Sequence, residues 1–166
     1  MPAIVENVRD ACENPENAEA RKKLMLAASQ AGMAFSNSSV ALVHGMSRPI
    51  GAHFHIAHGL SNAMLLPKIT EFSVQGNEER YAACARVMKW AHDTDSNASA
   101  CSKLVENLFI LNEDLKVPSP KSLGHIADKK TLKLMASQAL ASGSPQNNPR
   151  VPTENQIIKL YEEIWG

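Results

Sequence analysis

Apolar side chains recur at three- and four-residue intervals along most of the chain, and this spacing constrains the fold more than any other feature. Leu104, Leu108, Leu111 and Leu115 form one stripe, and a second stripe lies between residues 157 and 165. Such spacing follows the 3.6-residue period of an amphipathic helix. There is no internal repeat and no convincing strand–helix–strand unit. We therefore predict an all-α helical bundle in which residues 1–166 form a single helical domain.

Polar residues and prolines mark the expected helix boundaries. Asn14 is expected to cap a helix that has Pro15 at its first position. The many small residues of this helix suggest that it packs closely inside a bundle, and the serines and asparagine of residues 36–39 are expected to break it. Pro49 and Gly51 are expected to end or bend the next helix. The predicted helices span residues 3–12, 15–37, 40–47, 59–66, 78–92, 98–115, 129–141 and 153–165, the last with a Thr153–Gln156 capping box.

Composition excludes several classes of function. The chain has 17 basic and 17 acidic residues, so it offers no electrostatic surface for nucleic acid or an acidic membrane. No apolar run approaches the roughly 20 residues that span a bilayer, and the N-terminal residues do not resemble a signal peptide. Cys12, Cys84 and Cys101 are widely spaced, as is typical of reduced thiols. These features predict a cytoplasmic protein.

Four of the six histidines fall within fifteen positions, at residues 44, 53, 55 and 58. Neutral imidazole is a common ligand for divalent transition metals, and Fe²⁺ and Zn²⁺ both suit it. His44 and His58 are each followed by glycine, and we predict that they bind a metal. His53 and His55 lie two residues apart, so they would share a face in an extended segment and diverge in a helix. For these two, metal or substrate contact and a surface or pocket-lining role both remain open.

The segment around these histidines resembles the metal-binding signature of the iron-containing (group III) alcohol dehydrogenases. That family has His-Gly-Met-Ala-His-Pro followed by Pro-His-Gly, and this chain has His44-Gly-Met-Ser-Arg-Pro followed by Ala-His58-Gly. The continuation Ser61–Pro67 and a late Asn-Pro-Arg turn at residues 148–150 match as well. The resemblance implies that His44 and His58 supply two of four metal ligands in a C-terminal helical domain.

Arg48 is the sharpest departure from the family pattern, which has a histidine at that position. In a helix it would lie one turn from His44 on the same face. A guanidinium is always charged and cannot shuttle a proton as imidazole does. One hypothesis gives Arg48 a catalytic role, pairing with a substrate carboxylate or a cofactor phosphate. The alternative is a helix-end arginine that bonds backbone carbonyls.

The resemblance covers almost all of this chain but only about the last two-fifths of a family member. The family's other two ligands form an Asp-x-x-x-His pair that does not occur here, and no GxGxxG turn is present. We therefore expect a chain truncated at its N-terminus, which would need NAD(P) on a dinucleotide domain supplied by another chain. Small alcohols or aldehydes are the expected substrates, and self-association or association with the missing domain is expected because truncation exposes apolar surface.

Two further interpretations remain open. The chain could be a non-catalytic truncated remnant that folds as a helical bundle. It could also be a small metal-binding module in which His53 or His55 replaces the missing ligands.

Overall fold

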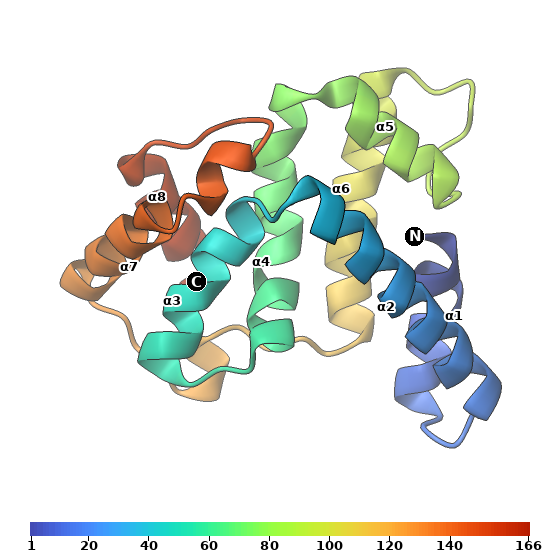
Figure 1. The fold of residues 1–166 in the computed structure, drawn as a ribbon, viewed down its shortest axis with the longest axis horizontal. Coiled ribbons are helices and arrows are strands. Elements are labelled where there is room, and N and C mark those ends of the chain that lie inside the picture. The colour runs from blue at the N-terminus through green and yellow to red at the C-terminus, as the bar shows by residue number, and fades with distance from the viewer. The chain divides into compact units, whose positions relative to one another are not determined.

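The computed structural model describes residues 1–166 and contains eight α-helices, three short 3₁₀ helices and no strands (Figure 1). The predicted all-α fold class is confirmed. The chain divides into two compact units, one of residues 1–39 with 78–115 and one of residues 40–77 with 116–166. That the two form the expected single domain stays a prediction. No helix is long and apolar enough to cross a membrane.

The elements are α1 (Pro2–Glu13), α2 (Ala18–Ser38), α3 (Leu42–Phe54), α4 (His58–Ser73), η1 (Val74–Gly76), α5 (Glu78–Val87), α6 (Asn97–Asp114), η2 (Lys121–Leu123), α7 (Lys129–Ala141), η3 (Ser144–Asn147) and α8 (Glu154–Trp165).

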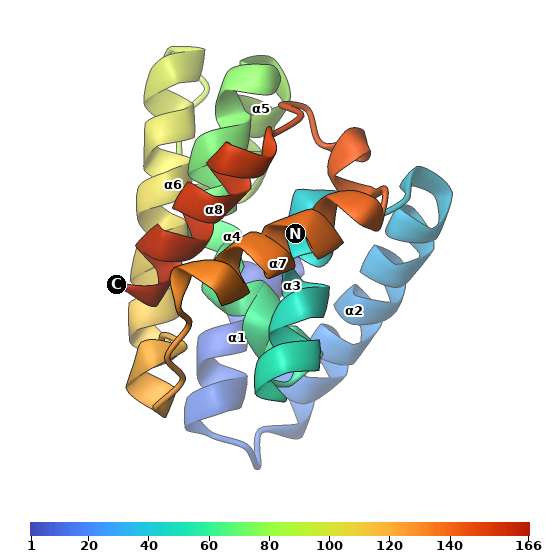
Figure 2. The same ribbon diagram turned by 90° about the vertical axis from the view of Figure 1, so that its left-hand side faces the viewer.

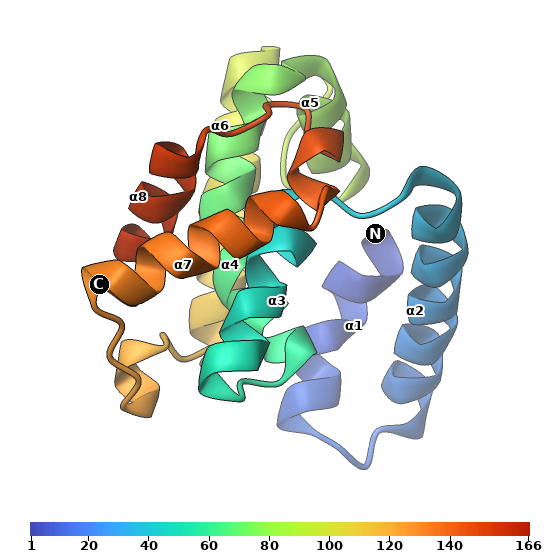
Figure 3. The same cartoon turned by 60° about the vertical axis from the view of Figure 1, so that its left-hand side comes forward.

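The first unit consists of two helical hairpins, α1 with α2 and α5 with α6, and the two helices of each hairpin lie side by side (Figures 1 and 3). Arg9 on α1 and Asp114 on α6 form an ion pair with 2.7 Å between Nε and Oδ2. Because both side chains are more than one-third exposed, the pair adds little stability. The predicted stripe on α6 is buried at Leu104 and Leu108, so this face of the helix is packed away from solvent.

Two expectations about α2 are wrong. The helix begins three residues later than predicted, because the side chain of Asn17, rather than that of Asn14, accepts hydrogen bonds from the backbone nitrogens of Glu19 and Ala20. Its small residues were expected to pack closely inside a bundle. Of the whole helix only Ala20 and Ala27 are buried, so most of α2 faces solvent.

The second unit contains a continuous apolar core at the meeting of α3, α4, α7 and α8 (Figure 2). Met46, Ile50, Leu65 and Met135 are all fully buried there. Tyr161 on α8 is also fully buried, and its phenol donates a hydrogen bond of 2.7 Å to the Met46 carbonyl of α3. This core fixes how α3 and α4 lie against each other.

Prolines do not interrupt α3 and α4 as expected. The helix predicted to end or bend near Pro49 runs on to Phe54, and α4 continues through Pro67 to Ser73. An internal proline removes one helical hydrogen bond, but both rings are buried in the unit. α3 ends at Phe54 and is capped by His55, whose φ of 55° is left-handed and whose N–H donates to the Gly51 carbonyl.

The remaining boundaries follow their caps. α7 spans the predicted residues 129–141, and Thr153 forms the predicted capping box with Gln156 at the start of α8. α5 ends at Val87, five residues earlier than expected. Lys89 has a φ of 61°, and the nitrogens of Lys89 and Trp90 bond back to the carbonyls of Arg86 and Ala85. This is a Schellman ending in which lysine occupies the position usually held by glycine.

Candidate metal centre

The structure brings His44 and His58 together within the second unit. His44 lies in the first turn of α3, and His58 is the first residue of α4. Their ring centroids are 5.2 Å apart, with the ring planes inclined at 53°. The helices cross so that the middle of α3 faces the start of α4, as the 2.7 Å hydrogen bond between Ser47 Oγ and Ser61 Oγ shows. Two histidines that are fourteen residues apart in the sequence thus lie next to each other in the fold.

The two rings suit a shared divalent metal. With metal–nitrogen bonds of about 2.1 Å and a tetrahedral angle between them, two imidazole centroids lie roughly 5 Å apart, close to the 5.2 Å observed. No group of three or more His, Cys, Asp or Glu side chains gathers anywhere in the chain to hold a metal. The two histidines therefore fit a metal as a pair of ligands, and no third candidate ligand joins them in this chain.

Electrostatics favour a neutral His44. Burial lowers the pKa of its imidazole, and the neighbouring His58 and the Arg48 guanidinium lower it further. A lowered pKa keeps the ring unprotonated at neutral pH, and only an unprotonated nitrogen can bind a metal. This surrounding favours a ligand role for His44.

The sequence analysis missed the groups that hold His58. Its Nδ1 lies 3.2 Å from Ser47 Oγ, and its Nε2 lies 3.1 Å from the Asn62 amide nitrogen. Ser61 donates to the His58 carbonyl over 3.0 Å. One signal could have found the serines, because His-Gly-apolar-Ser occurs twice, at residues 44–47 and 58–61. In a helix, each serine lies about one turn after its histidine.

Arg48 lies in the middle of α3, one turn after His44, and is exposed. Its Nη1 donates a 3.0 Å hydrogen bond to the hydroxyl of Ser144 at the start of η3. Gly45 permits this approach, since a Cβ there would meet the Pro145 ring at 3.0 Å. The alternative of a helix-end arginine is wrong, because α3 continues for six residues beyond Arg48.

The other histidines lie apart from this pair. His53 remains within α3 and pairs with the Gln138 side chain at 2.9 Å, whereas His55 caps the helix, so the two diverge. Both are exposed, which agrees with a surface role. His92 is exposed, and His125 is partly buried.

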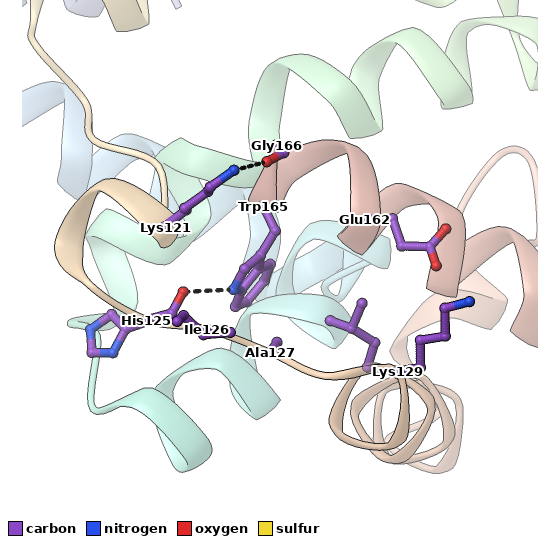
Figure 4. A pocket seen from close by; sticks show the side chains of 9 residues that line it. Lys121, His125, Ile126, Ala127, Lys129, Glu162, Trp165 and Gly166 are labelled. Atoms are coloured by element: carbon purple, nitrogen blue, oxygen red, sulfur yellow. Dashed lines mark hydrogen bonds between the residues drawn. The ribbon is translucent and has the colours of Figure 1, made fainter.

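His125 borders a separate cavity of about 400 Å³ (Figure 4). Its carbonyl accepts a 3.2 Å hydrogen bond from the Trp165 indole, and Lys121 donates to the Gly166 carbonyl nearby. The lining includes neither His44 nor His58. The cavity is therefore distinct from the histidine pair.

Comparison with known proteins identifies the class to which this fold and site belong. Residues 1–165 match the model of the C-terminal part of the Fe-containing alcohol dehydrogenase family. The chain belongs to this family.

Individual relatives agree. The chain is 34% identical to lactaldehyde reductase of Escherichia coli K12 over 151 residues, which are 89% of this chain and 38% of that protein. It is 29% identical to 1,3-propanediol dehydrogenase of Citrobacter freundii, covering 98% of this chain and 42% of that one. Among solved structures, a 1,3-propanediol oxidoreductase superposes with a TM-score of 0.92 at 29% identity, and an alcohol dehydrogenase from Oenococcus oeni with 0.90 at 34%. Each covers 98% of this chain and 42% of the solved chain, so this chain spans about two-fifths of its relatives.

Proposed function

We propose that this chain is the metal-side part of an NAD(P)-dependent alcohol dehydrogenase, with His44 and His58 as two of the metal's ligands. One observation carries the proposal: the two histidines of the family-like motif meet with 5.2 Å between ring centroids. A bound Fe²⁺ or Zn²⁺ would supply a Lewis acid that polarises the oxygen of a small alcohol or aldehyde. The nicotinamide cofactor and the remaining ligands would come from a dinucleotide domain outside these residues.

The chain's own residues contribute binding and charge. His44 offers a neutral nitrogen because burial and its cationic neighbour lower its pKa. Arg48 holds a fixed positive charge one turn away and is exposed, and its Nη1 donates a hydrogen bond to the Ser144 hydroxyl. A full positive charge close to a divalent cation is repulsive unless an anion lies between them. We therefore propose that Arg48 pairs with a carboxylate of the substrate or a phosphate of the cofactor.

Replacing Arg48 tests this role. In an assembly that includes a dinucleotide domain, Arg48→Ala should reduce kcat/KM for carboxylated substrates more than for neutral ones if the anion is the substrate's. If the anion is the cofactor's phosphate, the KM for NAD(P) should rise instead. Ser144→Ala, which removes the guanidinium's hydroxyl partner, is the control for a purely structural effect. Equal losses for both substrates at unchanged cofactor KM would reject the anion role.

Metal binding is the first test of the proposed function. Zn²⁺ titration of the purified, untagged chain by calorimetry should show one weak site, since two imidazoles form half a ligand set. His44→Ala and His58→Ala should each lower the affinity by more than the roughly 10- to 100-fold that a lost outer-shell partner costs. His92→Ala, on the exposed surface, should bind as the wild type does. Equal affinity in all four proteins would reject the metal centre.

The second candidate is a folded scaffold without catalysis. It is favoured by one observation, that no third ligand joins the two histidines in this chain. The third interpretation, a small metal-binding module in which His53 or His55 replaces a missing ligand, has less support. The His53 ring is hydrogen-bonded to the Gln138 side chain instead. A metal-free wild type that remains folded in the titration would favour the scaffold.

A further inference from the structure

Two buried serines form a hydrogen-bonded chain beneath His58. We propose that Ser47 and Ser61 are positioning residues that fix the neutral His58 ring as its Nδ1–H tautomer and so reserve Nε2 for the metal. This inference rests on the proposed function, because it concerns the same site. It assigns a role to two serines that are not among the proposed ligands.

Each serine hydroxyl has one proton to donate, and this determines the donor in each of the three hydrogen bonds that link the His58 carbonyl, Ser61, Ser47 and His58 Nδ1. The His58 carbonyl can only accept, so the Ser61 hydroxyl donates its one proton to it, over 3.0 Å. Ser61 Oγ must then accept from Ser47 in the 2.7 Å bond between the hydroxyls. Ser47 has no second proton, so its oxygen accepts from His58 Nδ1 over 3.2 Å. A neutral ring that carries its proton on Nδ1 has its lone pair on Nε2.

The second nitrogen of the ring agrees with this assignment. Nε2 lies 3.1 Å from the amide nitrogen of Asn62, which can only donate. The Asn62 side-chain oxygen is buried and has no hydrogen-bond partner. The lone pair of Nε2 is thus held by one replaceable donor on the same helix. A metal binding to this nitrogen would displace a single hydrogen bond.

Burial of both serines fixes the donor and the acceptor in each of these hydrogen bonds. Ser47 is 1% exposed and Ser61 is fully buried, so water cannot substitute for either hydroxyl, and a buried hydroxyl without a partner is costly. The resembled family motif has alanine where this chain has Ser47. A Ser47→Ala variant should therefore fold, which makes the proposal testable.

The test is the tautomer of His58, measured by nitrogen-15 NMR of the metal-free chain with labelled histidine, at a pH where the ring is neutral. In the wild type the His58 signals should report the Nδ1–H form. Ser47→Ala removes the acceptor for that proton, so the ring should shift toward the Nε2–H form. Ser61→Ala should shift it in the same direction, because the freed Ser47 proton can then turn toward Nδ1.

The control variant is Ser137→Ala on the exposed surface of α7, which should leave the His58 signals unchanged. The His92 signals serve as an internal control and should stay unchanged in every variant. A wild type that is mainly Nε2–H, or a tautomer unaffected by both serine variants, would overturn the proposal.

Zn²⁺ titration of the same proteins separates this proposal from the proposed function. Loss of Ser47 should weaken binding by roughly 10-fold, the lower end for an outer-shell partner. If the wild type binds no Zn²⁺ but shows the tautomer shift, the proposed function fails while the positioning role stands. If it binds Zn²⁺ and no variant alters the tautomer, the positioning role fails alone.

Discussion

Tyr161 joins two helices of the second unit through a single atom. Its ring lies wholly inside the core, and its phenol donates to the Met46 carbonyl, two residues from His44. Burial raises the pKa of this phenol above its ordinary value of 10.0, because the interior disfavours the charged form. One hydroxyl thus ties the position of α3 to α8.

Removing that hydroxyl should weaken the fold in a pH-dependent way. Tyr161→Phe keeps the ring and should lower the free energy of unfolding at pH 7 by about 1 kcal/mol, the net value of one hydrogen bond. A raised folded-state pKa gives stability that is fully present below the unfolded pKa and is lost as pH rises above it. The wild type's advantage over the variant should therefore shrink above about pH 10. Urea unfolding at pH 7 to 11 measures both.

Because other groups also titrate in this range, the comparison uses the difference between the two proteins. Tyr81→Phe, at a partly buried tyrosine of the first unit, tests whether any tyrosine has the same effect. A difference between wild type and Tyr161→Phe that stays constant up to pH 11 would contradict the argument.

At the scale of elements, the turn at residues 148–150 holds the end of α4. Asn148 donates to the hydroxyl of Ser73 and to the Arg150 carbonyl, and Arg150 donates to the Phe72 carbonyl. The Arg150 guanidinium also lies over the Phe72 ring, 4.1 Å from its centroid, a cation–π arrangement. The Asn-Pro-Arg turn therefore has a structural role: it binds the C-terminal end of α4, and we call this set of contacts the α4 clamp.

Gly76 allows this turn to approach. A Cβ at Gly76 would lie 2.5 Å from the Arg150 nitrogen and would also overlap the Pro149 backbone. Gly76→Ala should therefore destabilise the protein by roughly 1–3 kcal/mol, as overpacking does. Thermal unfolding checks this, with Gly59→Ala as control, since nothing lies within 4 Å of a Cβ there. Equal melting temperatures for wild type and Gly76→Ala would contradict the α4 clamp.

These elements also show what the sequence could and could not predict. The bounds of α7 and the start of α8 were predictable because their limits depend on local residues, such as the Thr153 capping box. The end of α3 was not, because burial of Pro49 in the core outweighs its helix-breaking tendency. Lys89 adopts the left-handed conformation that usually marks a glycine, so α5 was predicted too long.

The candidate metal centre was also only partly predictable from the sequence. Pairing of His44 with His58 could be predicted from the motif and its resemblance. The bonds around His58 could not, because they depend on where α3 crosses α4, which places Ser47 against Ser61. Only the repeated His-Gly-apolar-Ser pattern hinted at the two serines.

At the scale of the whole molecule, α2 exposes several large apolar side chains to solvent. Met25, Leu26 and Met33 are 74%, 61% and 64% exposed, and their spacing places them on one side of the helix. Beside them, an open hollow of about 1050 Å³ lies between α1 and α2 and is lined in part by Cys12 and Leu24. Exposed apolar side chains grouped on one helix face are a common feature of surfaces that contact a partner.

We predict that the chain self-associates through this face. The formal net charge is zero at pH 7, so long-range repulsion between copies is weak, and burial of the three side chains would favour contact. Sedimentation velocity should show a weight-average mass that rises with concentration, and Met33→Glu should suppress the rise. Ile126→Glu introduces the same charge at an 87% exposed position outside any helix, and it should associate as the wild type does. A wild type that remains monomeric at high concentration would contradict the prediction, and equal suppression by Ile126→Glu would show that added charge, rather than the α2 face, governs association.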